Sequence, residues 1–152
     1  MSRLINKDTR LCISLAGRPS NIGTRFHNFL YDQLDLDFIY KACTTEDLAA
    51  AIAGIRGLGI RGCGVSMPYK EACIPYLDEL DQSANTLQSV NTIVNDDGYL
   101  RAYNTDFIAI AKLLAVSGLS SELSFALRGS GGMAKAVAGA LYLSLIHISD
   151  GA

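Results

Sequence analysis

The sequence predicts an α/β fold in which helices flank a mixed, mainly parallel sheet. Short apolar runs typical of buried strands alternate with longer runs of helical periodicity, which is the pattern of β-α-β units. Later in the chain, two strand-like runs are joined by an Asp-Gly turn, which indicates an antiparallel hairpin. Apolar residues make up 49% of the 152 residues, which is enough to fill a core.

The first part of the chain predicts two strands and two helices. Residues 11–16 form a buried strand that ends in the turn at residues 17–20, whose Gly and Pro favour a change of direction. The helix that follows carries apolar residues on one face: Phe26, Phe29, Leu30 and Leu34. Residues 38–43 form the second strand. The next helix begins at a cap within residues 44–47 and buries three residues: Leu48, Ile52 and Ile55.

The central part predicts a strand that passes almost directly into a helix. Gly57 and Gly59 end the preceding helix. The strand at residues 62–67 runs into Pro68, which suits the first turn of a new helix. Residues 89–95 and 99–103 then form the hairpin around the Asp-Gly turn, so the sheet is mixed.

The last part predicts a boundary between two domains. A helix begins at Thr105 and stops at Gly118, after which residues 120–122 form a polar break. Residues 123–127 then form a strand, and a glycine turn opens another helix, as in the first βα unit of a dinucleotide-binding domain. We therefore expect residues 1–105 to form one domain, and residues 106–142 to form a linker helix and the truncated start of a second.

Charge and composition exclude several classes of function. There are 13 Lys and Arg residues against 15 Asp and Glu, and no basic run interleaves with aromatic residues, which argues against nucleic acids and anionic membranes as partners. No apolar run approaches the roughly 20 residues of a membrane span. The 4 cysteines lack C-x-x-C spacing, so we expect reduced thiols in a cytoplasmic protein. Two scattered histidines predict no metal site, and no G-x-S-x-G elbow supports a Ser/His/Asp triad.

Two charged residues follow strand ends and are candidates for catalysis. Lys70 lies on the first turn of the helix after the strand at residues 62–67, at the edge where open α/β sheets bind ligands. The positive end of that helix favours loss of the ammonium proton. Asp106 lies at the next junction of this kind. The alternatives are a solvated lysine and a helix-capping aspartate.

Asn91 and the glycine turn are candidates for ligand binding. Asn91 is an amide within an apolar strand, so either the core or a polyhydroxylated ligand must satisfy its hydrogen bonds. The turn Gly129-x-Gly131-x-x-Ala134 would let the backbone approach a pyrophosphate at a helix N-terminus. Glycine turns are also common structural devices, but the apolar strand before this one favours cofactor binding.

The order of these motifs resembles the shikimate dehydrogenase family over about residues 10 to 141. The motifs are a G-x-P near the first strand, V-S-M-P-Y-K-E, S-V-N-T-I-V, Y-N-T-D and G-S-G-G-M-A-K-A. The resemblance implies an α/β substrate-binding domain, followed here by only the first βα unit of a Rossmann domain that binds NADP or NAD. It also implies a small-molecule substrate, with reversible hydride transfer at a ring hydroxyl of shikimate or a related cyclic polyol acid.

The resemblance assigns roles to individual residues. Lys70 would transfer the proton, while Asp106 would orient Lys70 and accept a hydrogen bond from a ring hydroxyl. Ser66 and Asn91 would hold further substrate hydroxyls. The cofactor pyrophosphate would contact the residues of the glycine turn, which are Gly129, Ser130, Gly131, Gly132 and Met133.

Several positions depart from the family's pattern. The family's S-x-S-P, whose serine hydroxyls bind the substrate carboxylate, is Asn21-Ile22-Gly23-Thr24 here, so Asn21 and Gly23 replace the two serines. The family's N-V-T-[VM]-P begins with Gly64, and the glycine after its N-T-D is Phe107. These departures are typical of the divergent shikimate dehydrogenase-like branch. We therefore expect weak turnover of shikimate and a different or altered preferred substrate.

Three functions remain open for the parent protein. They are an NAD(P)-dependent dehydrogenase of shikimate type, a dehydrogenase specialised for quinate, and a non-catalytic ligand-binding module on the same fold. The glycine turn favours an enzyme, because a sensor has no use for the start of a cofactor domain. Residues 143–152 do not continue the family's pattern and resemble the translation of a sequencing adaptor. With most of the cofactor site missing, we expect this chain not to catalyse the reaction by itself.

Overall fold

The structure is a computed structural model that describes residues 4–120 and 123–149, with side chains described as far as Tyr142. In chain order its elements are β1 (Arg10–Leu15), α1 (Asn21–Gln33), β2 (Phe38–Cys43), α2 (Leu48–Gly57), β3 (Gly62–Val65), α3 (Tyr69–Ala72), the 3-10 helix η1 (Ile74–Tyr76), β4 (Glu79–Leu80), α4 (Gln82–Leu87), β5 (Thr92–Asp96), β6 (Tyr99–Tyr103), α5 (Thr105–Ser117) and α6 (Gly132–Ser149).

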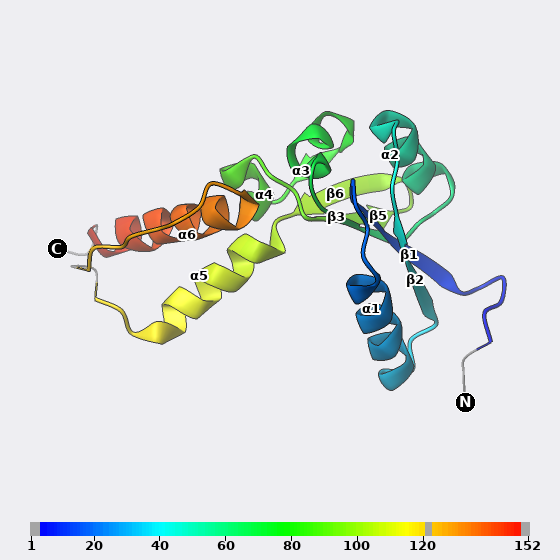
Figure 1. Cartoon of the computed structure of the whole chain (residues 1–152), viewed down its shortest axis with the longest axis horizontal. Coiled ribbons are helices and arrows are strands. Elements are labelled where there is room, and N and C mark those ends of the chain that lie inside the picture. Colours follow the sequence, from blue (N-terminus) through cyan, green and yellow to red (C-terminus); the bar gives the residue numbers. More distant parts are fainter. Residues whose placement is uncertain (1–3, 121–122, 150–152) are drawn as a thin grey trace.

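The described strands form one mixed sheet in the order β2-β1-β3-β5-β6-β4. β1 pairs in parallel with β2 and β3, whereas β5 is antiparallel to β3 and β6. The chain passes from β1 to its neighbour β2 on one side, and then returns past β1 to β3 on the other side. Because connections between parallel strands are right-handed, these two opposite directions place α1 and α2 on opposite faces of the sheet (Figure 1). The predicted fold class and the hairpin of β5 and β6 are confirmed.

The core lies between the central strands and α2. Ile52 and Ile55 of α2 are buried as predicted, and they belong to one cluster with Leu15 of β1, Ile93 of β5 and Leu100 of β6. Burial of side chains of this size stabilises the fold by roughly 1.5–3 kcal/mol each. The apolar residues of the central strands are thus committed to packing, and polar chemistry is left to the strand ends.

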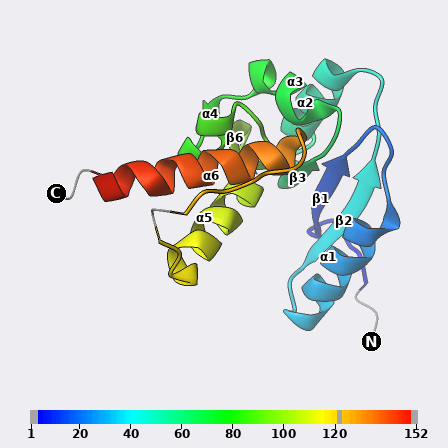
Figure 2. The ribbon, with the colours of Figure 1, turned by 60° about the vertical axis from the view of Figure 1, so that its left-hand side comes forward.

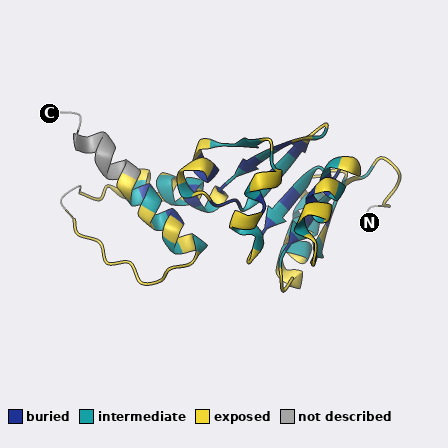
Figure 3. Ribbon diagram, turned by 90° about the horizontal axis from the view of Figure 1, so that it is seen from above, coloured by how far each residue is buried: buried dark blue, intermediate teal, exposed yellow. Residues whose placement is uncertain are grey.

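The predicted apolar face of α1 does not pack on the sheet. Phe26, Phe29 and Leu34 are 56%, 60% and 63% exposed, and Leu30 is half-buried. Figure 3 shows buried residues on the strands of the sheet and exposed residues on the outer faces of the helices and on the loops.

The helix contacts β2 through other side chains. The rings of His27 and Tyr31 lie against those of Tyr40 and Phe38, with 4.3 Å and 5.4 Å between centroids, and Asn28 supplies hydrogen bonds. Asn28 Nδ2 donates to the Tyr40 carbonyl at 2.8 Å, and the Tyr40 N–H donates to Asn28 Oδ1 at 2.9 Å. β2 is an edge strand whose outward backbone groups need partners, which an apolar helix face cannot supply.

Helices α5 and α6 lie side by side and extend away from the sheet, as Figures 1 and 2 show. Phe107 of α5 packs against Ala136 and Ala140 of α6 in a second, smaller cluster. The predicted strand at residues 123–127 is wrong: this segment pairs with no strand in the described part of the chain. A strand exists only by pairing with a neighbour, so an apolar run is not sufficient to make one.

The backbone of α6 continues to Ser149. The prediction that residues 143–152 are the translation of a sequencing adaptor falls on side chains, and on residues 150–152, that lie outside those described. None of the helices that the structure describes is long and apolar enough to cross a membrane.

Candidate active site

A cavity of about 330 Å³ opens at the carboxyl ends of β1 and β3. The chain leaves β1 toward β2 on one side and leaves β3 toward the hairpin on the other, so the cavity lies at the point where the sheet's connections diverge. Open α/β sheets bind their ligands at this position. The walls include five of the residues singled out from the sequence: Gly23, Ser66, Lys70, Asn91 and Asp106.

Lys70 and Asp106 form an ion pair in the cavity. The distance from Lys70 Nζ to Asp106 Oδ2 is 3.0 Å, and the two side chains are 21% and 26% exposed. They come from α3 and α5, which are far apart in the sequence. The carboxylate is thus placed to orient the ammonium group, while both remain open to a ligand in the cavity.

Hydrogen bonds around Lys70 fix the position of its helix, while the dipole of that helix has little effect on the ammonium group. The N–H of Val90 donates to the Lys70 carbonyl at 2.7 Å, and the Tyr69 hydroxyl donates to the Thr45 carbonyl at 2.6 Å. With only four residues, α3 carries a small dipole. The expected effect of a helix end on Lys70 is therefore weak, and Asp106 is the stronger electrostatic influence.

Asn104, not Asp106, caps α5. The Asn104 side chain accepts a hydrogen bond from the Phe107 N–H at 3.0 Å, and its Nδ2 donates to the Ser89 carbonyl at 2.9 Å. The alternative in which Asp106 serves as a helix cap is therefore wrong. Since Asn104 satisfies the helix terminus, the Asp106 carboxylate is free to pair with Lys70.

Asn91 is held at the cavity wall by Thr105. Asn91 Nδ2 donates to the Thr105 hydroxyl at 2.9 Å, and the Thr105 N–H donates to Asn91 Oδ1 at 2.9 Å. The protein thus satisfies part of the amide's hydrogen-bonding capacity, yet the side chain still lines the cavity. This pair also joins the start of β5 to the start of α5, so it holds Asp106 in position.

A second cavity, of about 340 Å³, lies between α3 and the glycine turn. Ser130, Gly131 and Gly132 line it, and Lys70 lines both cavities. A Cβ atom at Gly132 would lie 3.6 Å from Lys70 Nζ, so the ammonium group reaches the glycine turn. Lys70 therefore stands between the two predicted binding sites.

Three predicted residues do not line either cavity. Gly129 has φ of 131°, a conformation that favours glycine, so it shapes the turn. Met133 is 54% exposed, and Asn21 is an exposed residue at the start of α1.

Tyr40 and Ser14 line the first cavity but are not among the residues singled out from the sequence. The Tyr40 ring stacks on His27 with 4.3 Å between centroids. Burial raises the pKa of the Tyr40 phenol, so it is a hydrogen-bond donor at neutral pH. The available signal was a hydroxyl group on each of two predicted strands, β1 and β2, that end near the edge where ligands bind.

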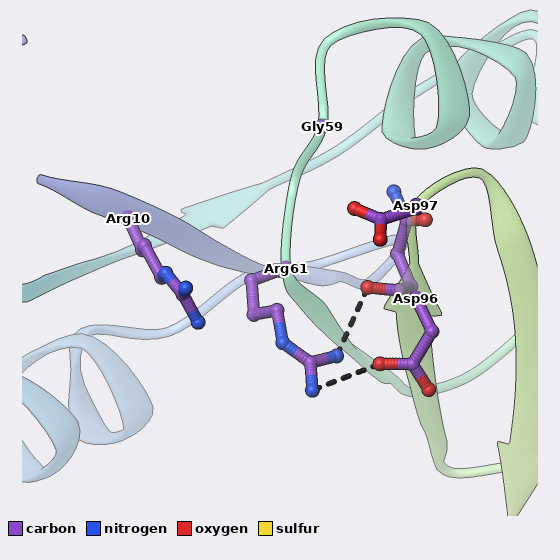
Figure 4. Close-up of a pocket in the computed structure, with 6 residues that line it drawn as sticks. Arg10, Gly59, Arg61, Asp96 and Asp97 are labelled. Carbon is purple, nitrogen blue, oxygen red and sulfur yellow. Dashed lines mark hydrogen bonds and ion pairs between the residues drawn. The ribbon is translucent and has the colours of Figure 1, made fainter. Parts of the chain in front are cut away.

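A third cavity lies at the opposite ends of the strands and is lined by Arg10, Arg61, Asp96 and Asp97, of which Arg61 and Asp96 point toward each other (Figure 4). Arg61 pairs with Asp96 at 3.0 Å and also donates to the Asn95 carbonyl at 2.9 Å. Arg61 and Asp96 thus neutralise each other, while the Arg10 guanidinium lies over the Phe38 ring, 5.9 Å from its centroid. In the part of the chain that the structure describes, no group of three or more His, Cys, Asp and Glu side chains could hold a metal ion.

Comparison with known proteins identifies the first cavity's domain. Residues 21–93 match the family model of the shikimate dehydrogenase substrate-binding domain. Over 137 residues the chain is 64% identical to a shikimate dehydrogenase-like protein of Haemophilus influenzae, an alignment that covers 90% of this chain and 51% of that protein. Residues 21–93 therefore carry the substrate-binding domain of the shikimate dehydrogenase family. The resemblance predicted from the motifs is thereby confirmed.

Solved structures of the shikimate dehydrogenase family share the fold. A shikimate 5-dehydrogenase-like protein has a TM-score of 0.90 and 62% identity, over 93% of this chain and 53% of that one. The shikimate 5-dehydrogenase of Listeria monocytogenes, solved in complex with shikimate and NAD, has a TM-score of 0.79 and 31% identity, over 94% of this chain and 51% of that one. The chain spans about half the length of the relatives it matches.

Proposed function

We propose that the whole protein catalyses reversible hydride transfer between a nicotinamide cofactor, NADP or NAD, and a ring hydroxyl of shikimate or a related cyclic polyol acid. The observation that carries this proposal is the Lys70–Asp106 ion pair, which lies in the first cavity and whose lysine also lines the second. Residues 1–105 would form the substrate-binding domain, and residues 106–142 a linker helix and the start of the cofactor domain.

The residues at the glycine turn suit a nicotinamide dinucleotide. Nothing lies within 4 Å of where a Cβ would stand at Gly131, so a phosphate could approach the backbone closely. The first turn of α6 contains no acidic residue to repel it, and the free N–H groups of a helix N-terminus favour an anion. When bound, the cofactor would supply or accept the hydride.

In this scheme the chain's own residues bind the substrate and move its proton. Oxidation of a ring alcohol to a ketone removes a hydride from carbon and a proton from the hydroxyl oxygen. Lys70 in its neutral form would take that proton, and as ammonium it would return it in the reverse direction. Asp106 would hold Lys70 and accept a hydrogen bond from the hydroxyl. Ser66 and Asn91 would bind neighbouring hydroxyls.

Activity of the full-length protein tests the proposal. We expect Lys70→Ala to lower kcat by about 10²- to 10⁴-fold, the range for loss of a general acid-base group, with shikimate or quinate and with NADP or NAD. Lys112→Ala, an exposed position on α5, is the matched control and should leave kcat unchanged. Unchanged turnover by Lys70→Ala would refute the assignment. The 152-residue chain should bind substrate without oxidising it, since it spans about half the length of its relatives.

A further inference from the structure

The wall of the first cavity carries a cationic side chain beside the two positions where the family's serines are replaced. Arg18 lies in the turn between β1 and α1 and lines the cavity together with Ser20 and Gly23. Its side chain is exposed. The ion pairs found among the described residues do not include Arg18.

The charge balance of the cavity favours an anion. Three charged residues line it: Arg18, Lys70 and Asp106. Lys70 and Asp106 neutralise each other, which leaves the positive charge of Arg18. The first turn of α1 contains no acidic residue, so the partial positive charge of that helix end adds to the charge of Arg18. The one carboxylate among the residues that line the cavity, that of Asp106, is paired with Lys70, so a substrate carboxylate near Arg18 would meet a net positive charge.

The backbone on both sides of Arg18 is fixed. The Gly17 N–H donates to the Met67 carbonyl at 2.9 Å, and a Cβ at Gly17 would lie 2.9 Å from Pro68 Cδ. Only glycine lets the turn approach the end of β3 so closely. On the other side Pro19 restricts its own φ. The backbone at Arg18 is therefore already ordered, so binding a ligand would cost it little conformational entropy.

We propose that Arg18 binds the substrate's carboxylate, in place of the serine pair that Asn21 and Gly23 replace. A planar guanidinium donates two parallel hydrogen bonds to a carboxylate, a stronger and more directional contact than hydroxyls provide. The assignment rests on the proposed function and narrows it to substrates that carry a carboxylate. The carboxylate would lie at the turn before α1, and the reacting hydroxyl at Lys70.

Binding of an acid and its neutral ester tests the role of Arg18. Titration calorimetry would compare shikimate with shikimate methyl ester on the 152-residue chain and on the full-length protein. We expect Arg18→Gln to weaken shikimate binding at least about tenfold, in line with loss of a charge-assisted hydrogen bond, and to leave ester binding unchanged. Arg25→Gln is the matched control, because Arg25 is an exposed arginine of α1 that does not line the cavity.

A second variant tests whether the arginine and the missing serine serve the same subsite. A Cβ at Gly23 would lie 3.7 Å from the nearest atom of Tyr40, which is ordinary contact, so serine fits there. Gly23→Ser added to Arg18→Gln should recover part of the affinity for shikimate and none for the ester. Equal weakening of acid and ester by Arg18→Gln, no weakening of either, or no recovery by the serine would overturn the proposal.

These outcomes are separable from the test of the proposed function. If Arg18→Gln leaves shikimate binding unchanged while Lys70→Ala abolishes turnover, the role of Arg18 is refuted and the dehydrogenase stands. If Arg18→Gln loses the acid and keeps the ester while the full-length protein transfers no hydride, the carboxylate subsite stands and the dehydrogenase is refuted.

Discussion

Asn104 shows how one buried amide prepares the candidate active site. It is 1% exposed, it caps α5, and it joins the start of that helix to the segment before β5. The sequence offered Asn104, Thr105 and Asp106 side by side, each of a type that can cap a helix. Asn104 is the cap because its side chain lies just before the first turn of α5, where it can accept a hydrogen bond from a free N–H group of that turn.

Replacing Asn104 with alanine should lower the free energy of unfolding by about 1–3 kcal/mol. The change removes the cap and leaves the Ser89 carbonyl without this partner in a buried position. Urea unfolding of the 152-residue chain would measure the loss. Asp106→Ala is the comparison: it breaks a partly exposed ion pair and should cost less than about 1 kcal/mol. Equal losses in the two variants would contradict the assignment of the cap.

At the scale of elements, α1 is the clearest departure from the expected packing. Its apolar periodicity predicted a buried face, but other residues connect it to the sheet. Thr24 and Asn28 hydrogen-bond to β2, and His27 and Tyr31 make ring contacts with it. Periodicity identifies the helix correctly because the same repeat governs any amphipathic helix. Periodicity cannot identify which face of the helix packs on the sheet. The backbone groups that need hydrogen bonds lie on the outer edge of β2, and the position of β2 at the edge of the sheet is decided by the tertiary structure.

Asn28→Ala should therefore destabilise the chain more than Phe29→Ala. The first change leaves the N–H and carbonyl of Tyr40 without these partners and should cost about 1–3 kcal/mol. The second removes a ring that is 60% exposed and should cost under about 1 kcal/mol. Thermal and urea unfolding of both variants would rank them. The reverse order would show that the Phe29 ring contributes more to stability than the hydrogen bonds of Asn28.

At the scale of the whole molecule, the candidate site depends on two packed units meeting at Lys70. The sheet supplies the first cavity, and the pair of α5 and α6 brings the glycine turn against α3 (Figure 2). An ion pair between Glu71 of α3 and Lys135 of α6 connects the units. Both of its side chains are about half exposed, so it orients the units more than it stabilises them.

Acid should weaken the sheet unit through Asp78. Hydrogen bonds from Arg56, and then from the Leu100 N–H, hold the pKa of this carboxyl below its usual range. A depressed pKa means that the stabilisation is complete above the ordinary value of about 4 and is lost as the pH falls below it. Urea midpoints from about pH 6 to pH 3 should therefore fall less steeply for Asp78→Asn than for the unmodified chain. Parallel curves would count against this role for Asp78.

The sequence by itself determined the first three strands and the helices between them, the hairpin, the buried face of α2 and the resemblance to the family. It did not predict β4, α4 or η1. The predicted features depend on local periodicity, turn residues and motif spacing, which neighbouring residues carry. It also singled out Lys70 and Asp106, because both follow strand ends. The role of Arg18, by contrast, had no signal beyond its place in a turn.

Only the tertiary structure decided which of these residues meet. It set the 3.0 Å contact of Lys70 with Asp106 and released Asp106 from capping. It placed Tyr40 and Arg18 at the cavity and turned the Phe26 and Phe29 rings of α1 outward. It also left residues 123–127 without a strand to pair with. The physical reason is common to all of them: pairing, burial and charge neutralisation depend on partners that lie far away in the chain, and a local pattern does not contain those partners.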